Sequence, residues 1–494
     1  MSQVLVRVRA LVLTVVLVSG GTAKCVPVNS VPVSQASTVI HADWERVVGS
    51  GPTHYGVEYG WIDQDRDLFL ERYRLLHANT VRVQVDQEYL EMVNDNDDPN
   101  VSEIDFDVTL PLDVEEGKYL SYREMFSALA TEFPDMYFHI NVWLAARWNA
   151  SDPNGYLGLG GAFPPLDYAE HGEFVRELAR WLVDTCGIAP ERLSFSFVNE
   201  PNLASFFVGT QADLVQMAAE TRSALDQVSP QIQIMGLDEV HGTGWTDDFY
   251  PQRPDGCCDA WTFHAYEQGV GPLWNALQTR VGHLSGYGPV WATEFADTNN
   301  GSPDAQMDFS TREAALGFAE VVGRLWASGA DGIIHFRLAD TYVDQLGGWA
   351  GHGLFADWRG IKSDGEPYAI HPSFWVFANL YGQLGGGQIV STTAPSDLVV
   401  VGARRDDVFP SRLALWVTNP TDTVYTTTVQ VTGFPTNTAQ IEVLDNLSGS
   451  MPVEILAAQG VPLTFDIVVP ERSSYTIIVK EPPPIAVYLP FAFS

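Results

Sequence analysis

Short apolar runs alternate with longer amphipathic segments between residues 51 and 387. The longer segments, such as Ala169–Cys186 and Gln211–Val228, place apolar residues three and four positions apart, as an amphipathic helix does. The apolar runs have the length and β-branched content of buried strands. They are Tyr55–Gly60, Thr80–Val85, Met136–Val142, Leu193–Val198, Ile232–Leu237, Ala260–His264, Val290–Thr293 and Gly332–Phe336. Eight strands alternating with helices predict an α/β fold, a parallel (β/α)8 TIM barrel over residues 51–387.

A doubly wound parallel sheet is the alternative to the barrel. That fold would need fewer strands and, for a dinucleotide, a glycine-rich phosphate loop after the first strand. The stretch Tyr55–Asp63 contains no G-x-G-x-x-G pattern. The pattern therefore favours the barrel, and we expect no cofactor.

The pattern changes after residue 387, where helical periodicity almost disappears. Short β-branched stretches separated by Asn, Pro, Gly and Asp predict an antiparallel β-sandwich domain over residues 388–480. The lead segment 24–50 contains the β-rich stretch Ser37–Val48, which can lend this domain a strand. Residues 481–494 form a proline-rich, apolar C-terminal tail, for which we predict no secondary structure.

The N-terminal residues 1–23 have the organisation of a secretory signal peptide. Two arginines precede the apolar stretch Ala10–Val18, and small residues follow it. An uncleaved anchor is the alternative, whereas Lys24 argues against a lipid-modified Cys25. We predict a secreted, extracellular protein with no stable membrane insertion after cleavage, which the C-terminal tail can retain at the cell surface.

The charge of the chain restricts the classes of molecule that it can bind. The 62 acidic and 27 basic side chains give a formal net charge of −35. Such a chain repels nucleic acids and polyanionic glycans unless it carries a local basic patch, and the sequence contains no Lys/Arg run. A neutral substrate is therefore expected, and no nucleic-acid partner.

The four cysteines are too few for a disulfide scaffold and lack the spacing of a zinc site. One disulfide between Cys186 and either Cys257 or Cys258 is compatible with an oxidising compartment. The acidic stretch Asn94–Asn100 lacks the glycine and distal glutamate of a calcium loop, so we interpret it as a solvated loop. No metal is expected.

Polar side chains occur where the predicted strands end, and such ends meet at one mouth of a parallel barrel. They are Arg82 and Asp86, Asn141, Trp143 and Arg147, Asn199 and Glu200, Asp238 and Glu239, His264 and Tyr266, Glu294, and His335 and Arg337. Glu200 and Glu294 follow the fourth and seventh strands, on opposite sides of the mouth. Cleavage of a glycoside with retention requires two carboxyls about 5–5.5 Å apart. We predict Glu200 as the acid/base and Glu294 as the nucleophile.

The neighbours of these acids suit the same chemistry. Arg82 and Tyr266 can donate hydrogen bonds to Glu294, because a nucleophile must stay ionised. His264 can bind substrate or hold one of the carboxyls. The sequence has no G-x-S-x-G motif, which excludes a serine-hydrolase elbow.

The sequence around these residues resembles clan A of the glycoside hydrolases, especially its cellulase-like and xylosidase-like families. The resemblance rests on Asn199-Glu200-Pro201, on His264-Ala-Tyr266 and on Glu294 in "WATEF", with Arg82 in "VRV" upstream. It extends in order over most of the barrel and to a trailing β-sandwich. It implies an acid/base at Glu200, a nucleophile at Glu294, and supporting roles for Arg82, His264 and Tyr266.

Two departures from the clan leave the sugar preference open. Val198 and the pair His335-Phe336 stand where many members have tryptophan, and Trp349 can substitute for the second of these. Asn199 is expected to bind a sugar 2-hydroxyl. Trp143 and Trp349 are expected to stack on sugar rings, with core packing as the alternative interpretation of each.

We therefore predict a secreted retaining β-glycoside hydrolase. Its substrates would be neutral β-linked poly- or oligosaccharides, cleaved by double displacement through a glycosyl-enzyme intermediate. Two alternatives remain: a non-catalytic carbohydrate-binding protein on a barrel scaffold, and a transglycosylase that uses the same two acids.

Overall fold

The computed structural model describes residues 36–91, 104–142, 145–152, 163–297, 310–343, 348–350, 353–360, 365–408 and 410–482. The predicted signal segment, the acidic stretch Asn94–Asn100, Trp143 and residues 483–494 lie outside these ranges. None of the helices in the described part of the chain has the length and apolarity of a membrane span.

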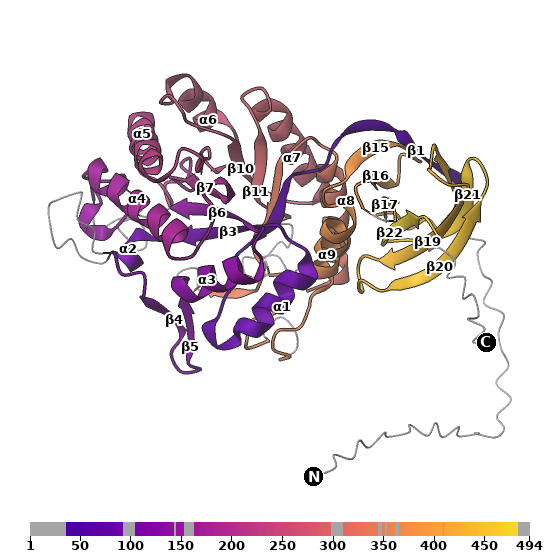
Figure 1. Cartoon of the computed structure of the whole chain (residues 1–494), viewed down its shortest axis with the longest axis horizontal. Helices are drawn as coiled ribbons and strands as arrows, with labels where there is room; N and C mark the ends of the chain where they lie inside the picture. Colours follow the sequence, from indigo (N-terminus) through magenta and orange to yellow (C-terminus); the bar gives the residue numbers. More distant parts are fainter. Residues whose placement is uncertain are drawn as a thin grey trace, which may run out of the picture. The chain divides into compact units, whose positions relative to one another are not determined.

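Parallel strands form the centre of the larger domain (Figure 1). They are β2 (His54–Glu58), β3 (Thr80–Val85), β6 (Tyr137–Val142), β7 (Leu193–Ser196), β8 (Gln233–Ile234), β9 (Glu239–Val240), β10 (Trp261–Glu267), β11 (Val290–Asp297) and β12 (Gly332–His335). The short strands β8 and β9 belong to one segment, which pairs with β7 through β8 and with β10 through β9. That segment closes the ring, so eight strand positions surround the barrel interior. The predicted TIM barrel is confirmed.

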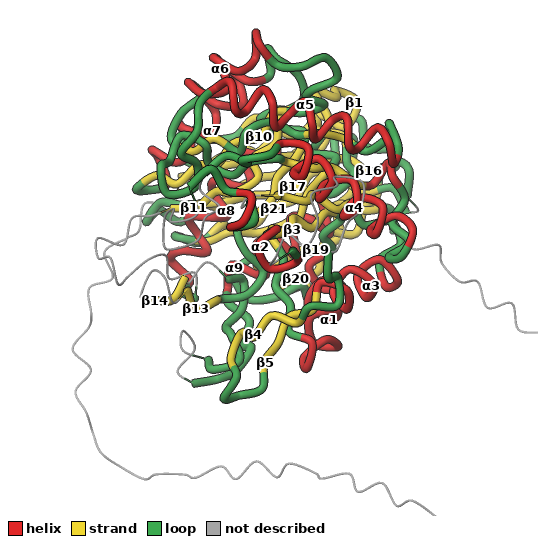
Figure 2. Tube along the Cα trace, turned by 90° about the vertical axis from the view of Figure 1, so that its left-hand side faces the viewer, coloured by secondary structure: helices red, strands yellow, loops and turns green. Residues whose placement is uncertain are grey.

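Helices follow the barrel strands and cover their outer side, and α3 to α7 lie around the strands in Figure 2. They are α1 (Arg66–Leu76), α2 (Gln87–Leu90), α3 (Tyr122–Glu132), α4 (Tyr168–Asp184), α5 (Gln211–Val228), α6 (Gly244–Phe249), α7 (Val270–Leu284), α8 (Arg312–Trp326) and α9 (Pro372–Leu384). Local sequence sets their ends: at α5, Thr210 and Asp213 cap each other's backbone N–H groups in a capping box. A small hairpin, β4 (Thr109–Asp113) and β5 (Lys118–Ser121), precedes α3.

The second domain is a closed sheet of nine described strands. They are β1 (Ala36–Ser50), β15 (Gln388–Thr393), β16 (Val399–Arg405), β17 (Arg412–Asn419), β18 (Tyr425–Thr432), β19 (Thr438–Asp445), β20 (Pro452–Gln459), β21 (Leu463–Val469) and β22 (Ser473–Lys480). The C-terminal β domain was expected, but its sheet closes on itself instead of remaining two separate layers. Closure occurs because β1 pairs antiparallel with β15 on one side and parallel with β18 on the other.

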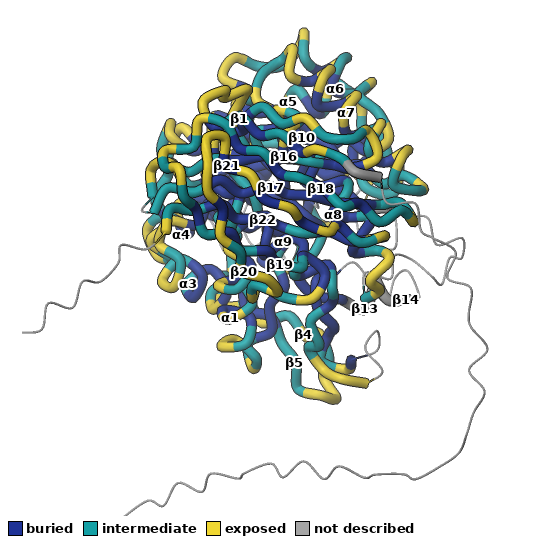
Figure 3. Tube along the Cα trace, turned by 90° about the vertical axis from the view of Figure 1, so that its right-hand side faces the viewer, coloured by how far each residue is buried: buried dark blue, intermediate teal, exposed yellow. Residues whose placement is uncertain are grey.

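Strand β20 carries a weak strand pattern in the sequence because most of it is exposed. Val453 and Ile455 are 60% and 62% exposed, so no buried face alternates with a polar one. By contrast, β17 and β22 are mostly buried, as the dark blue tubes in Figure 3 show. Both strands contact the barrel helices α8 and α9, and Ala414 and Trp416, on the outer face of β17, belong to the core that includes those helices.

The sequence left the cysteine pairing open, and the structure does not contain the bridge from Cys186 that was considered there. Cys257 is bonded to Cys258, and Cys186 is a free, half-buried thiol. Burial raises the pKa of the Cys186 thiol to about 11, and Ser127 of α3 hydrogen-bonds to it. The fold therefore places this thiol beside α3, whereas Cys257 and Cys258 lie in the turn before β10 and bond to each other.

Candidate active site

The polar residues of the site come from the C-terminal ends of the barrel strands. Arg82 shows how the sequence positions one of them: Val81, Val83 and Val85 pack in the core shared with the helices. Arg82, between them, points into the barrel, because successive side chains of a strand alternate between its two faces. It is fully buried.

Arg82 connects four other strand ends. One guanidinium nitrogen, Nη1, donates to both Glu58 Oε2 and Glu294 Oε1. The other, Nη2, donates to Asn199 Oδ1 at 2.8 Å and to Asp238 Oδ2 at 3.3 Å. A single arginine thus orients the predicted nucleophile and three of its neighbours, with the fixed fork geometry that suits this residue.

Glu294 accepts hydrogen bonds on both carboxylate oxygens. Tyr266 Oη donates to Oε2 at 2.5 Å, while Arg82 occupies Oε1. Strand pairing places His264 directly opposite Glu294, and Tyr266 lies two residues further along the same face of β10. The spacing His-x-Tyr therefore directs both rings towards this carboxylate.

Glu200 lies where the chain leaves β7. Its φ of +47° is unusual for a residue with a side chain, and Asp238 has a φ of +50°. Such backbone conformations occur preferentially at functional sites, where the surrounding structure holds them. Glu200 Oε1 lies 2.7 Å from His264 Nδ1, and the residue is 6% exposed.

The hydrogen-bond pattern assigns the proton between His264 and Glu200. His264 Nε2 faces Glu294 Oε1 at 3.5 Å and Asp238 Oδ1 at 3.7 Å, and both of these atoms accept but do not donate when ionised. The ring proton is therefore best placed on Nε2. Nδ1 is then an acceptor, so the Glu200 carboxyl must be protonated and donate to it. Burial lowers the pKa of His264, which keeps the ring neutral.

The ionisation of the two acids follows from their surroundings. Burial raises the pKa of both Glu200 and Glu294 to about 7. The carboxyl oxygens of Glu200 and Glu294 and a ring nitrogen of His264 all lie within 4.8 Å of one another. Two carboxyls so close do not ionise independently. The first charge settles on Glu294, because Arg82 and Tyr266 donate to it directly, whereas Glu200 contacts the neutral His264.

The same three residues offer the ligand atoms that a metal ion would need. However, the Arg82 guanidinium already contacts Glu294, and a positive charge at that position opposes a second cation. The arrangement therefore suits proton transfer between carboxyls better than metal binding.

Glu58 was not predicted as a site residue from the sequence; it is 1% exposed and shares Arg82 Nη1 with Glu294. The available signal was its position: Glu58 ends β2, as other site residues end their strands. Asp238 was noted only as a residue near the mouth. Burial would raise its pKa, but the charge of Arg82 and the hydrogen bond from Thr293 hold that pKa well below its usual range. Asn141 Nδ2 at 2.9 Å and Thr293 Oγ1 at 2.7 Å also donate to it.

Other polar residues predicted near the strand ends do not join the group around Arg82. They pack in the core or bind the start of a helix. His335 is buried against Phe318 and Phe377, on the helix side of its strand. Glu239 accepts hydrogen bonds from Trp245 and Thr246 at the start of α6. Asp86 caps α2 by accepting from the backbone of Glu88.

The tryptophan predictions remain open. Trp349 lies in β14 (Gly348–Ala350), paired with Tyr342 of β13 (Thr341–Val343). Trp143 is outside the described residues. Their expected stacking on sugar rings stays a prediction.

One family model matches part of the barrel. Residues 195–321 match a family model described as the glycosyl hydrolase catalytic core. This range includes Asn199, Glu200, His264, Tyr266 and Glu294. None of the curated proteins compared with the chain matches it in sequence.

Solved structures share the fold over both domains. A monomeric beta-xylosidase from Caulobacter crescentus CB15 has a TM-score of 0.65 and 14% identity, covering 90% of this chain and 100% of that chain. A glycoside hydrolase family 30 subfamily 8 xylanase from Clostridium acetobutylicum has a TM-score of 0.60 and 13% identity, with coverage of 90% and 100%. A glucosidase from Croceicoccus marinus has a TM-score of 0.62 and 14% identity, with coverage of 91% and 100%.

Proposed function

We propose that this chain is a retaining β-glycosidase, a proposal supported by the match of residues 195–321 to the glycosyl hydrolase catalytic core. The observation that carries this proposal is the separation of the two acids. An oxygen of Glu200 and an oxygen of Glu294 lie within 4.8 Å. Retaining enzymes hold their carboxyls about 5–5.5 Å apart, whereas inverting enzymes need about 6.5–9.5 Å to admit a water molecule.

In the first step, Glu294 attacks the anomeric carbon and the bond to the leaving oxygen breaks. Glu200 transfers its proton to that oxygen, so the aglycone leaves as an alcohol and Glu294 becomes a glycosyl ester. Arg82 and Tyr266 hold Glu294 in the ionised, attacking orientation. His264 keeps the proton on Glu200 until it is transferred.

In the second step, the ionised Glu200 removes a proton from a water molecule, which attacks the ester. The sugar is released with its original configuration, and Glu294 is again a carboxylate. Asn199 is held by Arg82 beside the two acids, where it can bind the sugar 2-hydroxyl that we expect it to recognise.

We propose neutral β-linked saccharides as substrates and secretion as the destination. The net charge of −35 disfavours polyanionic substrates, and the signal-like residues 1–23 support export. The xylosidase, xylanase and glucosidase with the same fold make aryl β-xylosides and β-glucosides, with xylan and β-glucan, the first substrates to test.

Replacing Glu294 by Gln should lower kcat on an aryl β-glycoside by about a thousandfold or more, because the amide cannot form the ester. Glu239→Gln is the matched control: this acid is also buried and belongs to a barrel strand, β9, but it accepts hydrogen bonds from the start of α6 and should leave kcat nearly unchanged. Full activity of the Glu294→Gln variant would refute the assignment.

The acid/base assignment has its own test. Glu200→Ala with added azide should release a glycosyl azide of retained configuration, seen by proton NMR, since azide needs no general base. An azide of inverted configuration would exclude the double displacement. Products longer than the substrate at high substrate concentration would indicate a transglycosylase instead of a hydrolase.

A further inference from the structure

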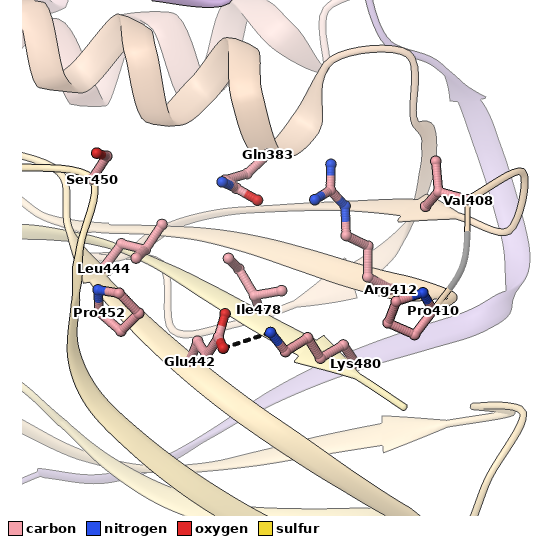
Figure 4. Close-up of a pocket in the computed structure, with 10 residues that line it drawn as sticks. All are labelled: Gln383, Val408, Pro410, Arg412, Glu442, Leu444, Ser450, Pro452, Ile478 and Lys480. Carbon is pink, nitrogen blue, oxygen red and sulfur yellow. Dashed lines mark hydrogen bonds and ion pairs between the residues drawn. The ribbon is translucent and has the colours of Figure 1, made fainter. Parts of the chain in front are cut away.

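A cavity of about 350 Å³ lies between the end of α9 and the face of the β domain formed by β17, β19 and β22. Its volume is within the usual range of small-ligand sites, about 300–1,000 Å³. None of the proposed catalytic residues lines it. Figure 4 shows polar groups from both domains around an apolar floor at Ile478.

Arg412 is the first feature of this cavity that points to a ligand. Its guanidinium has no direct carboxylate partner among the described residues. The charge of Asp407 is felt by Arg412, but the Asp407 carboxylate is bound by Arg405 at 2.7 and 2.9 Å. Arg412 Nη2 donates to the backbone oxygen of Gly382 at 3.1 Å, and its Nε is buried without a hydrogen-bond partner. In a chain of net charge −35, a half-buried arginine without a direct acid partner is a site for an anion.

Gln383 is the second, independent feature. It follows Gly382 on α9, and its Oε1 is buried without a hydrogen-bond partner in the described part of the chain. A buried carbonyl oxygen without a hydrogen-bond partner costs stability, and a donor on a ligand in this cavity would remove that cost. It accepts but does not donate, and therefore calls for a hydroxyl or amine on the ligand.

The remaining lining limits the charge of that ligand. Lys480 Nζ donates to Glu442 Oε1 at 2.5 Å, the dashed line in Figure 4, so these two charges cancel. Arg412 is then the uncompensated charge among the described lining residues. The ligand should carry one negative group, with hydroxyls for Gln383 and for the Ser450 side chain.

We propose that this cavity binds a small polyhydroxylated carboxylate, about the size of one or two sugar rings, with its carboxylate on Arg412 and a hydroxyl donated to Gln383 Oε1. Because Gln383 belongs to the barrel and Arg412 to the β domain, the bound ligand ties the two domains together. The site is independent of the proposed activity at Glu200 and Glu294.

Ligand-observed NMR and thermal unfolding of the full chain test the proposal. D-glucuronate is the probe, with D-glucose as the uncharged sugar and inorganic phosphate as the anion without the sugar frame. We expect glucuronate to raise Tm and to bind about tenfold or more tighter than either comparison compound. If glucose bound as tightly as glucuronate, Arg412 would have no role in recognition. If phosphate bound as tightly as glucuronate, the cavity would recognise only an anion. Either result overturns the proposal.

Gln383→Leu is the decisive variant, because it keeps the shape of the side chain and removes the unsatisfied oxygen. It should unfold at a higher temperature than the wild type without ligand, and bind glucuronate about tenfold or more weakly. Arg412→Gln should also lose binding, while the exposed Arg472→Gln is the control and should bind as the wild type does. Unchanged binding by Gln383→Leu, or loss of binding in Glu294→Gln instead, would contradict the proposal.

Discussion

At the scale of single residues, His264 determines which carboxyl keeps the proton. Its Nδ1 lies 2.7 Å from Glu200, and its Nε2 faces the acceptors Glu294 and Asp238. The sequence motif His-x-Tyr predicts that both rings share a face of the strand. It does not predict which ring nitrogen carries hydrogen, because the tautomer depends on acceptors that come from other strands.

Nitrogen NMR of the histidine side chains tests this assignment. Below about pH 7, we expect Nε2 of His264 to be the protonated nitrogen and Nδ1 to accept, because burial raises the pKa of Glu200 to about 7. In Glu200→Gln the side-chain NH₂ can still donate to Nδ1, so the same tautomer should persist. A proton on Nδ1 in the wild type would show that Glu200 is the acceptor and contradict the assignment.

At the scale of elements, close approach between a helix and a strand joins the two domains. Trp416 of β17 is fully buried and its Nε1 donates to the backbone oxygen of Ala319 in α8, at 2.9 Å. Gly323, one turn further along α8, leaves room for the indole, since a Cβ there would lie 2.6 Å from the ring.

Two glycine-to-alanine substitutions separate the effect of close packing on the free energy of unfolding from the effect of helix propensity. Gly282 of α7 is an exposed helical glycine with no neighbouring atom within 4 Å of a new Cβ, so Gly282→Ala should raise the free energy of unfolding by about 0.5–1 kcal/mol. Gly323→Ala should lower it by about 1–3 kcal/mol, because the new methyl overlaps Trp416. Denaturant unfolding measures both, and similar gains in the two variants would show that Trp416 is not held as described.

At the scale of the whole molecule, buried acids make stability depend on pH. Asp86 is 4% exposed, and burial raises its pKa to about 8. Its folded pKa lies above the unfolded value of about 3.9. Its contribution to stability is therefore complete below about pH 4 and is lost as the pH rises through about 8. Self-repulsion of a chain with net charge −35 acts in the same direction.

We expect Tm to fall between about pH 5 and about pH 8, and Asp86→Asn to reduce that fall. Asparagine still caps α2, so the substitution removes the titration without removing the cap. Asp135→Asn, at a side chain that is 100% exposed, is the control and should keep the wild-type dependence. An unchanged slope in Asp86→Asn would show that this carboxyl is not the titrating group.

Local sequence alone determined the order of strands and helices in the barrel, and the positions of Arg82, Glu200, His264, Tyr266 and Glu294 on the barrel strands or directly after them. Periodicity sufficed because each barrel strand is buried on both faces and each helix on one. The predicted range Gln211–Val228 coincides with α5 and Thr80–Val85 with β3, and these are segments with strong periodic patterns.

Only the tertiary structure decided the features that depend on residues distant in the sequence. Closure of the β domain needs β1, which precedes the barrel, to pair with strands that follow it. Glu58 becomes part of the site because Arg82 reaches it and Glu294 with one nitrogen. The cavity between Gln383 and Arg412 exists only where the two domains meet. Each of these is a contact across the fold, and periodicity along the chain carries no information about such contacts.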